Sequence, residues 1–203
     1  MATRTSILVW SDYVCPFCYL ALPVLNRAAE ELSVDVSWRA FELRPEPQPP
    51  LDPEGDYLLN IWETAVYPMA EERGMVLRLP PVQPRSRLAA MTAAFARSAG
   101  AFDAVHEALF RAFFEEGLDI GDRSVLLDIA TLAGLDSAEL HKALDEPALE
   151  ARIRAEEEQA MRLGIGGVPA IVIRHGVGEA YLLSGAQPFD VVQHAIEQAR
   201  AGV

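Results

Sequence analysis

Two short stretches near the amino end of the chain have the hydrophobic pattern of β-strands. Residues 6–10 are apolar and rich in strand-forming residues, and apolar side chains alternate with polar ones over residues 34–40. Between the two stretches, apolar residues recur at helical spacing, at Ala21, Val24, Leu25, Ala28 and Leu32. This order predicts a βαβ unit, in which the strands are parallel and the helix begins at the carboxyl end of the first strand.

A proline-rich connection separates this unit from a long helical region. Residues 44–53 hold five prolines, which interrupt both helices and strands. From residue 56 to residue 163 the apolar period is helical almost throughout, and the first apolar stripe runs from Leu58 to Met69. Later in this region, Asp136 with Glu139 predicts a capping box, and Pro147 predicts the first residue of a helix that Gly164 closes.

The strand pattern returns near the carboxyl end. Residues 170–174 and 180–184 flank a glycine-containing loop and predict an antiparallel hairpin, and a final apolar stripe from Phe189 to Ala199 predicts a helix. The chain therefore predicts one α/β domain made of residues 1–55 and 164–203. An inserted helical domain, residues 56–163, interrupts it.

Composition narrows the class of protein. The 203 residues are 51% hydrophobic and 23% charged, which is typical of a globular protein that folds without disulfides. The net charge of -13 opposes binding to nucleic acid or to an anionic membrane surface. The amino end has only a short apolar run and no stretch is long enough to span a bilayer, so we expect a cytoplasmic protein without an export signal.

The only two cysteines, Cys15 and Cys18, lie where the first strand gives way to the first helix. In a reducing compartment, a close cysteine pair indicates redox catalysis or metal binding more often than a structural bridge. The positive end of the helix dipole favours a thiolate at Cys15, and Pro16 suits the first helical turn. We therefore expect Cys15 to attack a disulfide and Cys18, one turn further on, to resolve the mixed disulfide.

Two other interpretations of the cysteine pair remain open. A CxxC supplies half of many zinc sites, but the four histidines, at positions 106, 141, 175 and 194, are too widely spaced to complete one, so we expect no metal. Alternatively, the pair is inert, because burial in apolar surroundings raises the pKa of a thiol.

The late strand is preceded by Gly167, Val168 and Pro169. With the CxxC at the first helix and the helical insertion, this arrangement resembles the DsbA-like branch of the thioredoxin superfamily. The resemblance implies a thioredoxin-like fold in which Pro169 is a cis-proline facing the cysteines. It also implies that Val168 offers its backbone to the substrate and that the residues between the cysteines, Pro16 and Phe17, contact substrate.

Further motifs are similar to those of the FrnE-like group of dithiol oxidoreductases, namely residues 15–20, 41–43, 167–169 and 184–188. The chain departs from that group at Phe17, where tryptophan is usual, and at Arg85 and Ser86, where asparagine precedes serine or threonine.

The chain also has Val9 where many members of the superfamily have a buried acid. Asp12 and Glu42 are therefore candidates for accepting a proton from Cys18. The alternative is that Asp12 caps the helix or is solvated and that Glu42 is exposed.

Together these features predict a cytoplasmic dithiol-disulfide oxidoreductase or isomerase acting through Cys15 and Cys18 on a protein or small-molecule thiol or disulfide. No bound cofactor is expected; glutathione is a candidate redox partner, and the recycling partner is unknown.

The alternative is a glutathione-dependent enzyme similar to kappa-class transferases or 2-hydroxychromene-2-carboxylate isomerases. Those relatives use serine at the first cysteine position and lack the second thiol. A third interpretation is a non-enzymatic binder with a Met- and Phe-lined apolar groove in the insertion.

Overall fold

The computed structural model describes residues 4–202, which build around a four-stranded mixed sheet of order β2-β1-β3-β4. Strand β1 (Thr5–Ser11) pairs in parallel with β2 (Asp35–Ala40) and antiparallel with β3 (Ala170–His175). Strand β4 (Ala180–Ser184) completes the predicted hairpin against β3. The predicted strands and their directions are confirmed.

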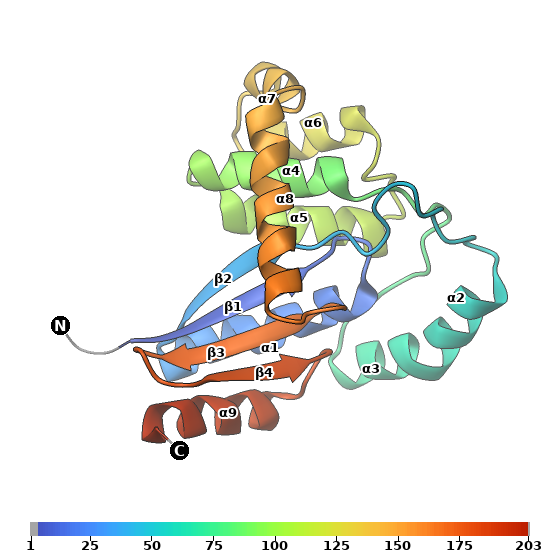
Figure 1. Cartoon of the computed structure of the whole chain (residues 1–203). Helices are drawn as coiled ribbons and strands as arrows, with labels where there is room; N and C mark the ends of the chain where they lie inside the picture. Colours follow the sequence, from blue (N-terminus) through green and yellow to red (C-terminus); the bar gives the residue numbers. More distant parts are fainter. Residues whose placement is uncertain (1–3, 203) are drawn as a thin grey trace.

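Helices cover both faces of the sheet (Figure 1). Helices α1 (Pro16–Leu32) and α9 (Phe189–Ala201) pack on one face, where the side chains of Ile7 and Val9 are fully buried. Trp10 points to the other face because side chains alternate along a strand. There it is buried against α8 (Pro147–Arg162), and its Nε1 donates a hydrogen bond to the Glu156 carbonyl oxygen at 3.0 Å.

The inserted segment between β2 and β3 is helical. Helices α4 to α7 lie together at one end of the molecule, whereas α2 and α3 lie apart from them beside the end of the sheet (Figure 1). The bounds of these elements are α2 Asp56–Ile61, π-helix η1 Trp62–Val66, α3 Tyr67–Glu72, α4 Arg87–Ser98, α5 Phe102–Phe114, α6 Arg123–Leu132 and α7 Ser137–Ala143. The fold is thus thioredoxin-like with a large helical insertion.

The apolar stripe from Leu58 to Met69 is not one regular α-helix, because the π-helix interrupts it. The buried residues Leu58, Trp62 and Val66 recur every four positions, so the wider π-turn keeps them on one side. Pro68 contributes to the irregularity, since it has no N–H to donate to the preceding turn.

Several predicted helix ends are confirmed. Asp136 is the N-cap of α7 and accepts hydrogen bonds from the N–H groups of Ala138 and Glu139. Pro147 begins α8, and Gly164 beyond the end of that helix adopts a left-handed φ of 73°.

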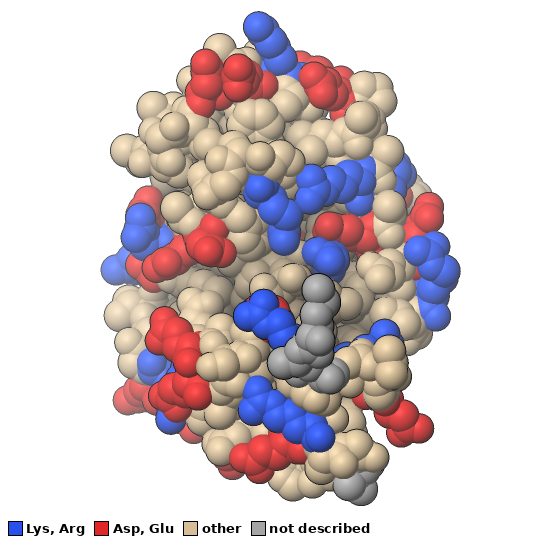
Figure 2. Space-filling model, turned by 90° about the vertical axis from the view of Figure 1, so that its left-hand side faces the viewer, with Lys and Arg blue, Asp and Glu red and all other residues tan. Residues whose placement is uncertain are grey.

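The acidic net charge is not spread evenly over the surface. Figure 2 shows Lys and Arg side chains gathered across the middle of one face, among Asp and Glu side chains. Within residues 4–202, no helix is long and apolar enough to cross a membrane.

Candidate active site

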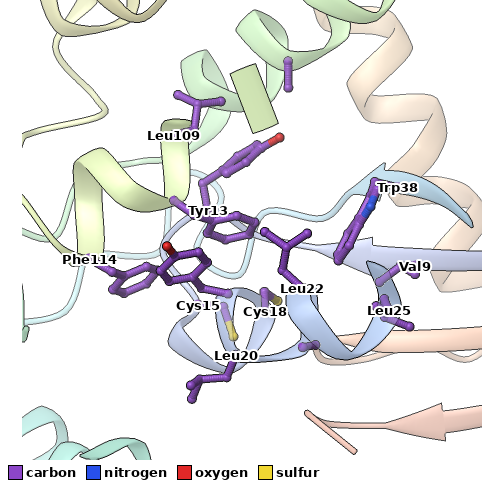
Figure 3. Close-up of a cluster of buried hydrophobic side chains, with 14 of the residues drawn as sticks. Val9, Tyr13, Cys15, Cys18, Leu20, Leu22, Leu25, Trp38, Leu109 and Phe114 are labelled. Atoms are coloured by element: carbon purple, nitrogen blue, oxygen red, sulfur yellow. The ribbon is translucent and has the colours of Figure 1, made fainter. Parts of the chain in front are cut away.

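The two cysteines occupy the start of α1 (Figure 3). Cys15 is the N-cap residue, with extended backbone angles, and Pro16 begins the helix. The Cys18 N–H donates a hydrogen bond to the Cys15 carbonyl oxygen at 3.0 Å, which places Cys18 one turn further on. Both thiols are free, and the exposed fraction is 4% for Cys15 and 0% for Cys18. Reagents therefore reach Cys15 before Cys18.

Burial controls the protonation of Cys18. Removal from water raises the pKa of the Cys18 thiol well above its usual value, and the adjacent Cys15 thiol raises it further. The Ser11 hydroxyl and the Asp12 backbone N–H would stabilise a thiolate at Cys18, which lowers the pKa, but this effect is smaller. Cys18 is consequently held as a thiol, and it must lose a proton before it can act as a nucleophile.

The loop before β3 lies directly beside Cys15. The Cys15 thiol donates to the Val168 carbonyl oxygen, at a distance of 3.5 Å from Sγ to the oxygen. The peptide bond between Val168 and Pro169 is cis, as the family resemblance implies. The structure therefore brings together Cys15, Cys18 and the Val-Pro pair from opposite ends of the chain.

A cavity of about 240 Å³ opens next to Cys15. Its wall is mostly apolar and comes from the CxxC turn, the proline-rich connection, α2 and the segment before α4. We call it the substrate pocket, and define it by Val14, Cys15, Pro16, Phe17, Leu43, Arg44, Pro50, Leu51, Tyr57, Leu58, Ile61, Trp62, Gln83, Pro84, Arg85, Phe114, Gly167 and Val168. Pro169 lies on a neighbouring surface hollow instead.

Arg85 anchors the proline-rich connection over the substrate pocket. Its guanidinium donates to the carbonyl oxygens of Arg44, at 2.8 Å, and Gln48, at 2.9 Å. In the sequence, Arg85 is notable only as a departure from the FrnE-like pattern. No sequence pattern predicts that Leu51 and Tyr57 lie at the site, because neither the path of a proline-rich segment nor the docking of α2 follows from periodicity.

Asp12 is buried, with 2% of its surface exposed, and no side chain caps the start of α1, so the alternative that Asp12 caps the helix or is solvated is wrong. Its carboxylate accepts hydrogen bonds from the N–H groups of Leu43, at 2.7 Å, and Val14, at 3.3 Å. Burial raises its pKa to about 6, although hydrogen bonds from Leu43, Ser86 and Val14 oppose the rise. Asp12 thus ties the CxxC turn to the proline-rich connection and to the start of α4.

Glu42 is also buried rather than exposed, with 7% of its side chain accessible. It accepts from Arg87 at 2.7 Å, and Arg87 bonds Glu157 of α8 at 3.0 Å. Burial raises the pKa of Glu157, and Arg87 opposes the rise. Among the described residues, neither Asp12 nor Glu42 makes a side-chain hydrogen bond to a thiol, and both carboxylates instead join the insertion to the sheet.

Comparison with known proteins finds relatives that match nearly the whole chain. The chain is 35% identical over 194 residues to the uncharacterised protein YwbO of Bacillus subtilis, with 94% of each chain covered. Among solved structures, a probable DsbA oxidoreductase from Streptomyces coelicolor has a TM-score of 0.78 at 27% identity, covering 98% of this chain and 91% of that one.

Two more distant structures share the fold. A 2-hydroxychromene-2-carboxylate isomerase has a TM-score of 0.78 at 18% identity, with 95% of each chain covered. The cytosolic disulfide reductase DsbM of Pseudomonas aeruginosa, solved with glutathione, has a TM-score of 0.73 at 22% identity, covering 96% of this chain and 99% of that one. Residues 6–197 match the DSBA-like thioredoxin domain, and the chain belongs to that family.

Proposed function

We propose that the protein is a dithiol-disulfide oxidoreductase that works by thiol-disulfide exchange at Cys15 and Cys18. The main support is the position of the Cys15 thiol, which lies 3.5 Å from the Val168 carbonyl oxygen. Cys15 is at the start of a helix and in the wall of an apolar pocket, and Cys18 lies one turn further along the helix. A nucleophile, a resolving thiol and a place for the substrate are therefore adjacent.

The first half of the reaction takes place at Cys15. The Cys15 thiolate attacks one sulfur of a substrate disulfide, a new sulfur-sulfur bond forms, and the other half of the substrate leaves as a thiolate. The backbone of Val168 and the side chains of Pro16 and Phe17 line the approach to Cys15 and contact the bound substrate.

The second half takes place at Cys18. After Cys18 loses its proton, its thiolate attacks the Cys15 sulfur, the mixed disulfide breaks, and the reduced substrate leaves. The enzyme is then a disulfide, and two equivalents of a thiol such as glutathione return it to the dithiol. The reverse sequence oxidises a dithiol substrate. Isomerisation occurs when another thiolate of the substrate attacks the mixed disulfide before Cys18 does, which forms a different substrate disulfide and releases Cys15 as a thiolate.

The substrate pocket indicates what kind of disulfide is accepted. Its aromatic and aliphatic wall suits an apolar arm, and Arg44 and Arg85 at the same wall suit an anionic group. We propose glutathione as a redox partner and the cytoplasm as the place of action. Supporting both proposals is the fold shared with DsbM, which is a cytosolic disulfide reductase crystallised with glutathione.

Two other functions receive less support. The fold shared with a 2-hydroxychromene-2-carboxylate isomerase favours a glutathione-dependent isomerase, but such an activity leaves Cys18 without a role. A non-enzymatic binder would need an exposed Met and Phe groove, and Phe110 and Phe113 of the insertion are instead fully buried in the core.

Insulin reduction in the presence of glutathione tests the proposal. The wild-type protein is expected to accelerate the reaction and Cys15→Ser to lose all acceleration, and an active Cys15→Ser would overturn the proposal.

A chromene substrate assayed with glutathione tests the alternative, which predicts full activity in Cys18→Ser. The reduction potential of the pair then gives the direction, since a potential above that of the cytosolic glutathione pool indicates an oxidant.

A further inference from the structure

A second cavity, of about 30 Å³, lies at the carboxyl ends of β1 and β2, between the sheet and the insertion. It shares no lining residue with the substrate pocket. Its polar and charged lining residues are Ser11, Tyr13, Arg39, Arg97, His106 and Glu156, and its apolar lining includes Trp38 and three alanines of α4. We call it the polar cavity.

Two buried polar atoms of the polar cavity have no hydrogen-bond partner among the described residues. They are Ser11 Oγ and His106 Nε2, in residues that are 8% and 3% exposed. The other ring nitrogen of His106 is hydrogen-bonded to the Tyr13 hydroxyl at 2.7 Å. Burial lowers the pKa of His106 to about 3, so its imidazole is neutral. An unpartnered buried polar group is unfavourable, and a cavity of this size accommodates one or two waters that would satisfy both atoms.

Ser11 also faces the resolving cysteine. Alternation along β1 puts its side chain on the same face of the sheet as Val9, which is the face that α1 covers. The Ser11 hydroxyl can donate to the Cys18 thiolate, and it is at the same time part of the wall of the polar cavity. Ser11 therefore connects Cys18 with the cavity.

We propose that Ser11 and the polar cavity carry the proton of Cys18 out of the core during resolution. This inference rests on the proposed function. The Cys18 S–H bond breaks, its proton passes to Ser11 Oγ, and the proton that Ser11 held passes to water in the cavity. The Cys18 thiolate then attacks the Cys15 sulfur, and the departing substrate thiolate takes a proton from solvent, so that protons and electrons balance.

The charged groups around the polar cavity favour passage of the proton to solvent without retaining it. Glu156 of α8 contributes a carboxylate that is 17% exposed and therefore leads towards solvent. It accepts the N–H of Ala40 at 2.7 Å, so it is held at the cavity wall. Arg97 contributes positive charge on the same wall and, together with burial, lowers the pKa of His106, so His106 does not retain the proton.

A stopped-flow reaction with the aryl disulfide dithiobis(nitrobenzoate) separates the two halves of the exchange. Attack by Cys15 releases the first nitrothiobenzoate, and attack by Cys18 on the mixed disulfide releases the second. Ser11→Ala is expected to slow the second phase at least about tenfold and to leave the first phase unchanged. Its second phase is also expected to rise more steeply with pH than that of the wild type, because hydroxide must then remove the proton directly. Ser11→Thr, which keeps the hydroxyl, is expected to restore the wild-type rate.

A second variant addresses the cavity and leaves Ser11 in place. Ala94→Val fills the polar cavity and is expected to slow only the second phase, whereas Ala108→Val on α5, outside the cavity, is not. A second phase of unchanged rate in Ser11→Ala, or an equal slowing of both phases, would overturn the inference. A wild-type protein that releases no second nitrothiobenzoate would instead overturn the proposed function, so the two failures are distinguishable.

Discussion

The Cys15 sulfur lies 3.5 Å from the carbonyl oxygen of Val168, a residue 153 positions further along the chain. The sheet explains this closeness. Strands β1 and β3 are antiparallel neighbours, and Trp10 near the end of β1 is paired with Ala170 at the start of β3. The residues that follow β1 and those that precede β3 must therefore meet at the same end of the sheet, whatever the length of the insertion between them.

The buried carboxyl of Asp12 makes stability depend on pH. Its pKa in the folded protein, about 6, is above its ordinary value of 3.8, so the folded state binds this proton more tightly than the unfolded state. The stabilisation is complete below about pH 4 and is lost as the pH rises through 6. Between pH 5.5 and pH 7.5, we expect Asp12 to contribute a decrease of about 0.8 kcal/mol in the free energy of unfolding.

Asp12→Asn removes that contribution. Urea unfolding of the reduced wild-type and variant proteins across this range measures the difference, and the range avoids the isoelectric point near 4.7. The decrease with pH should be smaller in the variant by about the amount given. Parallel pH dependences for the two proteins would show that Asp12 is ionised to the same extent in the folded and unfolded states.

Arg87 is expected to be important for stability because it neutralises two buried acids. Its side chain is 17% exposed, and those of Glu42 and Glu157 are 7% and 16% exposed. Arg87→Ala would leave both carboxylates largely buried and without a counter-charge, and we expect a loss of about 3 kcal/mol in the free energy of unfolding.

A matched control for Arg87→Ala is Arg154→Ala. Arg154 pairs with Glu150 on the surface of α8, where solvent screens the pair, so we expect no more than a small change in the unfolding midpoint. Equal destabilisation by the two variants in urea would contradict the assignment of the Arg87 cluster as a link between the insertion and the sheet.

The arginines of the substrate pocket are expected to select anionic disulfides. Arg85→Gln removes one positive charge from the pocket wall and weakens the anchoring of the proline-rich connection. The ratio of kcat/KM for dithiobis(nitrobenzoate) to that for the neutral dithiodipyridine should fall at least about threefold. Arg154→Gln, far from the pocket, provides the control. A ratio that stays constant would mean that Arg85 is structural and does not contribute to selection.

Much of the fold could be predicted because its signals are local. The alternation over residues 34–40, the apolar stripe of α1 and the turn between β3 and β4 each depend on a few neighbouring residues. The CxxC could be placed for the same reason, since its position between a strand and a helix is visible in the sequence.

The rest depends on contacts between distant segments. Asp12 and Glu42 look like ordinary surface acids until Leu43 N–H and Arg87 are brought to them, which no local pattern indicates. The substrate pocket likewise exists only once Arg85 has anchored the proline-rich connection. The polar cavity requires β1, β2, α4, α5 and α8 together.

Mass spectrometry of trapped mixed disulfides identifies the attacking thiol. Cys18→Ser incubated with glutathione disulfide should carry one glutathione, mapped to Cys15, because no second thiol remains to release it. Cys15→Ser should remain unmodified, since Cys18 is fully buried and protonated. A glutathione on Cys18 in Cys15→Ser, with none on Cys15 in Cys18→Ser, would show that Cys18 and not Cys15 is the attacking thiol.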